Sequence, residues 1–129
     1  MTLLSYRILI ADDNKTFADT LAMLLKNILG DKLNRLDFAT NGRQAVEMAL
    51  GDTQYDIIFM DVHMPDIDGI EAAQVINRTH YRNTRIIAVS FEKDMNSVTR
   101  MISAGAENYL HKENITMETI ERLFEVKVL

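Results

Sequence analysis

The sequence predicts an α/β fold, in which a doubly wound parallel sheet of five strands carries five helices on its two faces. The alternation of two sequence patterns leads to this prediction. Short apolar runs rich in Ile and Val alternate along the chain with longer segments whose apolar residues recur every three to four positions. Such alternation implies parallel strands joined by right-handed helical crossovers, and these crossovers place helices on both faces of the sheet.

The apolar runs differ in strength, and this difference predicts where each strand lies in the sheet. Three runs are continuous, which is typical of strands buried on both faces, so we expect them in the centre. They cover residues 7–11, 56–60 and 85–89. Two weaker runs, expected at the edges, cover residues 36–38 and 108–110.

Five amphipathic helices are predicted between and after these strands. The first has Asn14 as its expected N-cap and Gly30 just past its end. Its apolar residues are Phe17, Leu21, Leu24, Leu25 and Ile28. The apolar residues of the other four helices lie within residues 45–50, 70–76, 98–102 and 117–124.

Length and composition limit the classes of protein to consider. A chain of 129 residues fits one domain, expected to span residues 1–129. The net charge of −5, from 14 Lys and Arg against 19 Asp and Glu, argues against direct binding of nucleic acid. The chain has no Cys and no apolar run near the ~20 residues of a membrane span. We therefore expect a cytoplasmic protein that does not enter a membrane.

The polar residues that follow the strands predict the chemistry. Ligands of a doubly wound sheet bind beyond the carboxyl ends of its strands. There the sequence places Asp12, Asp13, Asp61, Ser90 and Lys112. Clustered carboxylates repel one another and call for a cation, and oxygen ligands favour Mg²⁺ (or Mn²⁺). Together with a hydroxyl and an ammonium, they predict a phosphoryl-transfer site with an aspartate as nucleophile, for which Asp61 is the best candidate.

These residues lie in motifs that resemble the receiver domain of bacterial two-component response regulators. The motifs are the acidic pair at 12–13, DIIFMDVHMPDIDG around Asp61, IIAVS ending in Ser90, and AGAENYLHK ending in Lys112. The resemblance covers nearly the whole chain. It implies a flavodoxin-like sheet of strand order 2-1-3-4-5 and a signalling switch that becomes a phosphoprotein when Asp61 forms an aspartyl phosphate. The implied donor is a histidine kinase or a histidine phosphotransfer protein.

The same resemblance implies a role for each site residue. Asp13, Asp61 and the backbone carbonyl of His63 would bind Mg²⁺, and Asp12 would act on the metal through water. Ser90 and Lys112 would contact the phosphoryl oxygens, and Tyr109 would turn inward when Ser90 moves toward the phosphate. His63 and Glu92 hold positions that tune the lifetime of the phosphoryl group in the family.

Two residues depart from the family pattern. Glu113 follows Lys112 where the family usually has a proline after a cis peptide bond. Phe91 follows Ser90 where the family prefers a small residue, and its ring is expected to cover the phosphorylation pocket or to slow delivery by a kinase.

Two other functions stay open at this point. One is a pseudo-receiver, a protein-interaction module that is not phosphorylated, which Phe91 and Glu113 favour. The other is an aspartyl-phosphate phosphatase, but such enzymes carry a second acid-base Asp and a substrate cap, whereas Asp61 is followed by Val62 and His63. The chain is therefore not expected to be a dedicated enzyme beyond promoting its own phosphorylation and dephosphorylation. Its output would be a downstream protein target or an output domain outside these 129 residues.

Overall fold

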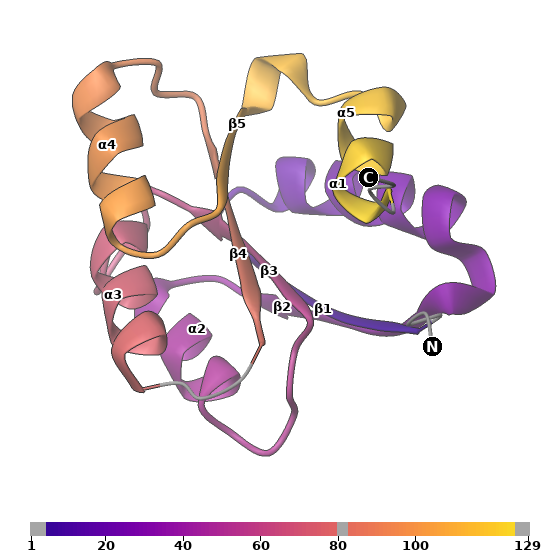
Figure 1. Ribbon diagram of the computed structural model, residues 1–129, viewed down its shortest axis with the longest axis horizontal. Coiled ribbons are helices and arrows are strands. Elements are labelled where there is room, and N and C mark those ends of the chain that lie inside the picture. Colours follow the sequence, from indigo (N-terminus) through magenta and orange to yellow (C-terminus); the bar gives the residue numbers. More distant parts are fainter. Residues whose placement is uncertain (1–4, 80–82, 126–129) are drawn as a thin grey trace, which may run out of the picture.

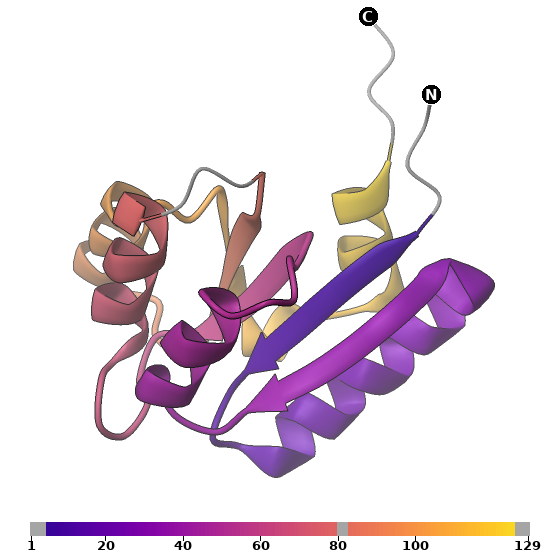
Figure 2. The same ribbon diagram turned by 90° about the horizontal axis from the view of Figure 1, so that it is seen from below.

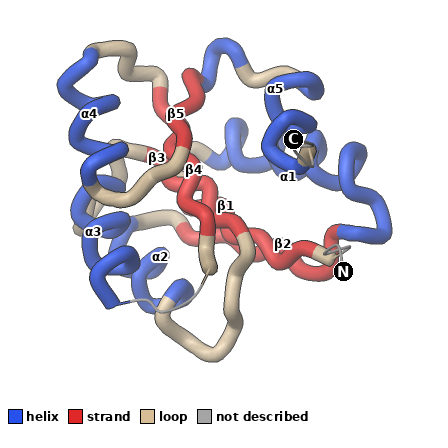
Figure 3. Tube along the Cα trace, in the orientation of Figure 1, coloured by secondary structure: helices blue, strands red, loops and turns tan. Residues whose placement is uncertain are grey.

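The computed structural model describes residues 5–79 and 83–125 and contains one sheet of five parallel strands. The strand order is β2-β1-β3-β4-β5, which confirms the predicted fold class and order. Figure 3 shows the strands in red, with helices on either side of them. The strands are β1 (Tyr6–Ala11), β2 (Leu33–Ala39), β3 (Ile57–Asp61), β4 (Arg85–Ser90) and β5 (Asn108–His111). The expected domain ends at residues 1 and 129 lie outside the described residues.

Helices cover both faces of the sheet, as predicted. The α-helices are α1 (Lys15–Leu29), α2 (Gly42–Ala49), α3 (Gly69–Thr79), α4 (Met95–Ser103) and α5 (Met117–Glu121). Figure 1 shows α1 and α5 on one side of the sheet and α2, α3 and α4 on the other. Three short 3₁₀ helices are η1 (Gly30–Lys32), η2 (Lys112–Asn114) and η3 (Arg122–Phe124). Within the described part of the chain, no helix has the length and apolar character needed to span a membrane.

Alternate residues of the central strands form two hydrophobic cores. Successive side chains of a strand point to opposite faces of the sheet. In β1, Ile8 and Ile10 therefore pack with α1 and α5, whereas Leu9 and Ala11 pack with the residues of α2, α3 and α4. All four side chains are fully buried. Burial on both faces explains why the run from Ile8 to Ala11 is continuously apolar.

The last predicted helix is divided in the structure. Its residues Met117 to Phe124 form α5 up to Glu121 and then the 3₁₀ helix η3. Thr116 caps α5, because its side chain accepts a hydrogen bond from Thr119 N while the Thr119 hydroxyl accepts one from Thr116 N. Ile120 in α5 and Leu123 in η3 are both buried, so the apolar pattern is preserved although the helix type changes.

The strands all deliver their carboxyl ends to one edge of the sheet. Figure 2 shows the arrows of β1 and β2 pointing in the same direction, and the registers of the other neighbouring strands are also parallel. The loops after β1, β3, β4 and β5 therefore gather at this edge, which carries the predicted site residues.

Candidate functional site

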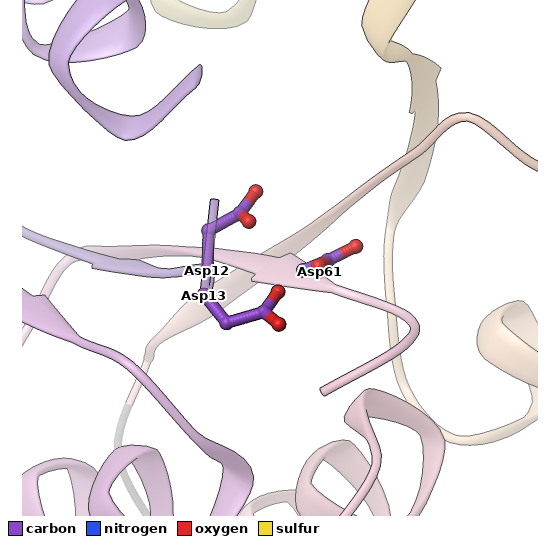
Figure 4. Close-up of side chains that lie close together, drawn as sticks. All are labelled: Asp12, Asp13 and Asp61. Atoms are coloured by element: carbon purple, nitrogen blue, oxygen red, sulfur yellow. The ribbon is translucent and has the colours of Figure 1, made fainter. Parts of the chain in front are cut away.

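Three carboxylates come together at the carboxyl edge of the sheet. Asp12 and Asp13 follow β1, and Asp61 is the last residue of the neighbouring strand β3. One carboxylate oxygen from each residue lies within 4.8 Å of the other two. Figure 4 shows the three side chains close together. In residues 5–79 and 83–125, this is the one group of three or more His, Cys, Asp or Glu side chains arranged to hold a metal ion.

Neither Asp12 nor Asp13 caps the following helix α1, although aspartates commonly fill that role. Asn14 caps α1 instead, because its side chain accepts a hydrogen bond from Phe17 N. Asp12 Oδ1 accepts a bond of 2.8 Å from Asn14 N, which fixes the turn after β1. Asp12 is buried and Asp13 is exposed. One carboxylate therefore lies under the surface beside Asp61, and the other faces solvent.

Lys112 brings a buried positive charge to this cluster. Its Nζ lies 2.7 Å from Asp12 Oδ2 and 3.5 Å from Asp61 Oδ1, and only 4% of its side chain is exposed. Lys112 opens η2, directly after β5, and no cis peptide bond occurs in the described residues, so the peptide before Glu113 is trans. The lysine thus reaches both carboxylates although Glu113 stands where the family usually has proline.

The charges in the cluster are unbalanced, and Asp61 shows the consequence. Burial raises the pKa of Asp61 from 3.8 to about 7, and the negative charge of Asp12 adds to the increase. The Lys112 ammonium acts in the opposite direction, and Asp13 raises the pKa further. Three carboxylates share one ammonium, so a bound cation would favour ionised Asp61.

The loop that follows Asp61 is fixed by close backbone contacts at both of its ends. Gly69 N donates a hydrogen bond of 2.8 Å to Val62 O. A Cβ at Gly69 would lie 1.9 Å from the Asp61 carbonyl oxygen, and one at Gly42 would lie 1.8 Å from the Ile67 oxygen. Both positions therefore exclude any side chain. This packing fixes the main chain that holds Asp61 and His63.

An ion pair also holds this loop against α2. Arg43 Nε lies 2.8 Å from Asp66 Oδ2, and both side chains are largely exposed. This pairing lowers the pKa of Asp66 and raises that of Arg43. Asp66 has a φ of 74°, a left-handed conformation that Asp and Asn adopt more readily than most residues.

Ser90, Glu92 and Tyr109 form a second group beside the acidic cluster. Ser90 ends β4, is 1% exposed, and accepts a hydrogen bond of 3.0 Å at Oγ from Glu92 N. The Tyr109 hydroxyl donates to Glu92 O at 3.1 Å. Its half-buried ring meets the His111 ring edge to face at 5.6 Å. The loop after β4 therefore links the buried Ser90 hydroxyl to the tyrosine of the edge strand.

His63 lies at the exposed mouth of the site. Its Nε2 is 3.7 Å from Glu92 Oε1, a contact that joins the loops after β3 and β4. The two residues implied to tune the phosphoryl lifetime thus face one another.

Two phenylalanine rings lie against the Lys112 ammonium. The ring centre of Phe17, on α1, is 4.6 Å from Lys112 Nζ, and that of Phe91, after β4, is 5.2 Å away. Phe91 is 54% exposed, so the ring covers the lysine from the solvent side. Sequence reasoning placed Phe17 only on the apolar face of its helix. The position of Phe17 in the first turn of α1, directly after the acidic pair, indicates that it lies at the carboxyl edge of the sheet.

The donor set fits a hard divalent cation. All three carboxylates offer oxygen, the ligand type that Mg²⁺ prefers, and Mg²⁺ commonly uses one or two carboxylates and keeps several waters. Burial, and after it the negative charge of Asp12, raise the pKa of Asp61, and a bound cation would favour its ionised form. Asp13 and Asp61 are suited to direct contact, whereas Asp12 is already engaged by Lys112.

Comparison with known proteins identifies relatives of the whole region that carries this site. The family model described as "Response regulator receiver domain" matches residues 8–124. The signal transduction histidine-protein kinase BarA of Shigella flexneri is 33% identical over 110 residues, which are 84% of this chain and 11% of the kinase. The chain thus corresponds to about a tenth of the length of that relative.

Solved structures agree with the family match. The signal receiver domain of a DNA binding response regulator protein (merR) from Colwellia psychrerythraea has a TM-score of 0.81 and 28% identity, covering 95% of this chain and all of that one. The receiver domain of the sensor histidine kinase PA1611 from Pseudomonas aeruginosa has a TM-score of 0.79 and 25% identity, covering 92% and 93%. That structure has a magnesium ion coordinated in its active site cleft.

Proposed function

Because the chain belongs to the response regulator receiver domain family, we propose that it is a signalling switch that accepts a phosphoryl group on Asp61. The donor is a histidine kinase or a histidine phosphotransfer protein. The observation that carries the proposal is the gathering of Asp12, Asp13 and Asp61 around buried Lys112 at the carboxyl edge of the sheet. The histidine kinase among the relatives supports the class of donor.

In the proposed reaction, a carboxylate oxygen of Asp61 attacks the phosphorus atom of the donor. The P–N bond to the donor histidine breaks as the acyl phosphate bond forms, and the electron pair of the broken bond stays on the imidazole nitrogen. Asp61 must be ionised to attack, and the Lys112 ammonium 3.5 Å away favours that form. Lys112 is also placed to contact a phosphoryl oxygen. Mg²⁺, when bound, supplies positive charge to the carboxylates and to the phosphoryl oxygens.

The response to phosphorylation is proposed to pass through Ser90. If its hydroxyl turns toward the phosphoryl group, it gives up the hydrogen bond from Glu92 N. The Glu92 carbonyl accepts from Tyr109, so movement of this loop also removes the contact that holds the tyrosine in its present position. The phosphoryl group on β3 would thereby change the surface near β5, where a downstream target or an output domain reads it.

The remaining assignments belong to the same proposal. His63 supplies its backbone carbonyl to the metal, and its side chain with Glu92 tunes access of water to the phosphoryl group. Mg²⁺ (or Mn²⁺) is the cofactor. We also propose one receiver domain that is not a dedicated enzyme, has a cytoplasmic location and makes no direct contact with nucleic acid, in line with the net charge of −5.

Incubation with acetyl phosphate and Mg²⁺, followed by mass spectrometry of the intact protein, tests the proposal. The wild type should gain one phosphoryl group, and Asp61→Asn should gain none. Asp66→Asn is the matched control, because it removes an exposed carboxylate of the same loop at a φ of 74° that Asn also adopts. It should be phosphorylated as well as the wild type.

Two results would contradict the proposal. A full mass gain on Asp61→Asn would place the phosphoryl group on another residue. A wild type that gains no mass and binds no beryllofluoride, the analogue of a phosphoryl group, would instead favour the pseudo-receiver.

A further inference from the structure

The buried ammonium of Lys112 has four close neighbours, and two of them are aromatic rings. Asp12 and Asp61 approach it at 2.7 and 3.5 Å. The ring centres of Phe17 and Phe91 lie 4.6 and 5.2 Å away. Both ring distances fall within the ~6 Å over which the face of an aromatic ring attracts a cation.

The two rings come from separate parts of the chain. Phe17 belongs to α1, which follows β1, and Phe91 follows β4. Lys112 follows β5 and starts a 3₁₀ helix of three residues. Side chains from α1 and from the loop after β4 thus converge on the ammonium of Lys112, and the two rings occupy directions of approach that would otherwise be open to water.

Aromatic rings suit this position because they attract the cation without adding formal charge. A further carboxylate would pair with Lys112 but would add to the repulsion among the three clustered carboxylates. An aliphatic cover would exclude water and offer no negative face. An aromatic ring excludes water and also offers a negative face. It leaves the ammonium free to meet an anion on the side of the carboxylates.

We propose that Phe17 and Phe91 are positioning residues, an aromatic clamp that holds the Lys112 ammonium in place for a phosphoryl oxygen. The inference deepens the proposed function and rests on it. It assigns to Phe91 a role opposite to that of a simple barrier: a barrier slows phosphorylation, whereas a clamp supports it.

Phe91 is the ring to test, because it is 54% exposed and its replacement removes little of the core. Phe91→Leu keeps an apolar cover and loses the aromatic face, whereas Phe91→Tyr keeps both. Phe38→Leu is the control for loss of a ring near the site, since Phe38 is 42% exposed and lines the cavity beside Asp12 and Asp13. Thermal unfolding followed by circular dichroism should show that all three variants are folded.

Two affinities are measured for each protein by titration. Binding of Mg²⁺ alone reports on the carboxylates, and binding of beryllofluoride in saturating Mg²⁺ also reports on Lys112. Phe91→Leu should leave the affinity for Mg²⁺ unchanged and weaken beryllofluoride binding about threefold to tenfold, the effect of a cation–π contact. Phe91→Tyr and Phe38→Leu should match the wild type.

A second readout follows Lys112 itself. NMR relaxation of its ¹³Cε in the wild type should show a restricted side chain. The side chain should be less restricted in Phe91→Leu than in the wild type, and as restricted in Phe91→Tyr as in the wild type.

The outcomes separate the clamp from the proposed function. If the wild type binds beryllofluoride and Phe91→Leu binds it equally well or more tightly, the ring is a cover or a barrier and the clamp is wrong. If Phe91→Tyr behaves as Phe91→Leu does, the aromatic face is not the cause, and the clamp is again wrong. If the wild type binds neither Mg²⁺ nor beryllofluoride, the proposed function fails and the clamp fails with it.

Discussion

The two ends of the sheet carry similar residue types and use them in opposite ways. At the carboxyl edge, Asp12, Asp13 and Asp61 share one ammonium. At the amino end, Arg85 and Glu107 form a matched pair, with 2.7 Å between Arg85 Nη2 and Glu107 Oε2. Negative charge is therefore uncompensated in the acidic cluster at the carboxyl edge, whereas the pair at the amino end is balanced.

The amino end joins the elements of the fold. Arg85 also donates from Nη1 to Leu123 O, which ties β4 to the C-terminal helical segment. Arg7 N donates to Asp56 Oδ2 and Asp56 N donates to Arg7 O, which connects β1 to the segment before β3. Charge balance therefore distinguishes the end of the sheet that joins the elements of the fold from the end that carries the acidic cluster.

The largest expected effect is a pH dependence of stability caused by the buried carboxylate of Asp61. The pKa of Asp61 is 3.8 ordinarily and about 7 in the folded protein. The folded state therefore binds more protons between these values, and the free energy of unfolding should fall as the pH rises through this window. The loss is up to about 4 kcal/mol, from roughly 3 pH units at 1.36 kcal/mol each.

Urea unfolding in EDTA from pH 4 to 8 measures this effect, with Asp61→Asn as the comparison. The variant should lack the part of the slope that belongs to Asp61. Identical slopes in the two proteins would show that Asp61 titrates at its ordinary pKa and that its surroundings do not disfavour its ionised form.

The next effect concerns the metal. Asp13→Asn removes an exposed carboxylate of the cluster and should weaken Mg²⁺ binding at least about tenfold, because a neutral amide replaces an anionic ligand. Asp19→Asn, an exposed residue of α1 paired with Lys15, is the control and should bind Mg²⁺ normally. Isothermal titration calorimetry provides both affinities, and an unchanged value for Asp13→Asn would place the ion elsewhere.

A smaller effect is expected from a hydrogen bond away from the acidic cluster. The Tyr55 hydroxyl donates to Asp37, which also pairs with Arg35, and burial together with this bond raises the pKa of Tyr55 to about 12. Tyr55→Phe removes one hydrogen bond and should cost about 1 kcal/mol of stability. Acetyl phosphate should still phosphorylate the variant fully. Loss of phosphorylation would mean that this hydrogen bond and the acidic cluster are not independent.

The last expected effect is a change in the response to phosphorylation, with phosphorylation itself preserved, and it concerns Ser90. Ser90→Ala should still accept the phosphoryl group, because the nucleophile and Lys112 are untouched. The signals of ¹³C-labelled Tyr109, however, should no longer respond to beryllofluoride. Ser90→Thr keeps the hydroxyl and should keep the response. A full response in Ser90→Ala would show that the signal reaches Tyr109 by another route.

Sequence reasoning predicted most of the fold because the patterns were strong. The run from Ile8 to Ala11 admits only a buried strand, and Asn14 and Gly30 bound α1 as expected. The C-terminal helix was harder to predict, since an α-helix and a 3₁₀ helix bury Ile120 and Leu123 equally well.

Those parts of the candidate site that depend only on the topology of the sheet were predictable from the sequence. Parallel strands bring their ends together, so the meeting of Asp12, Asp13 and Asp61 followed from their places after β1 and β3. The ring of Phe17 against Lys112 was not predictable, because it depends on how α1 crosses the sheet. Periodicity assigns a residue to a helix face and does not say which side chain from another loop will meet it.

The main-chain contacts at Gly42 and Gly69 bear on the entropy of ion binding. Each glycine lies so close to a carbonyl oxygen that the loop between β3 and α3 has little room to move. The conformational entropy of this loop is therefore lost when the chain folds, and not when a cation arrives. A cation at the proposed metal site would meet a loop that is already ordered, so its binding would be governed by charge and dehydration.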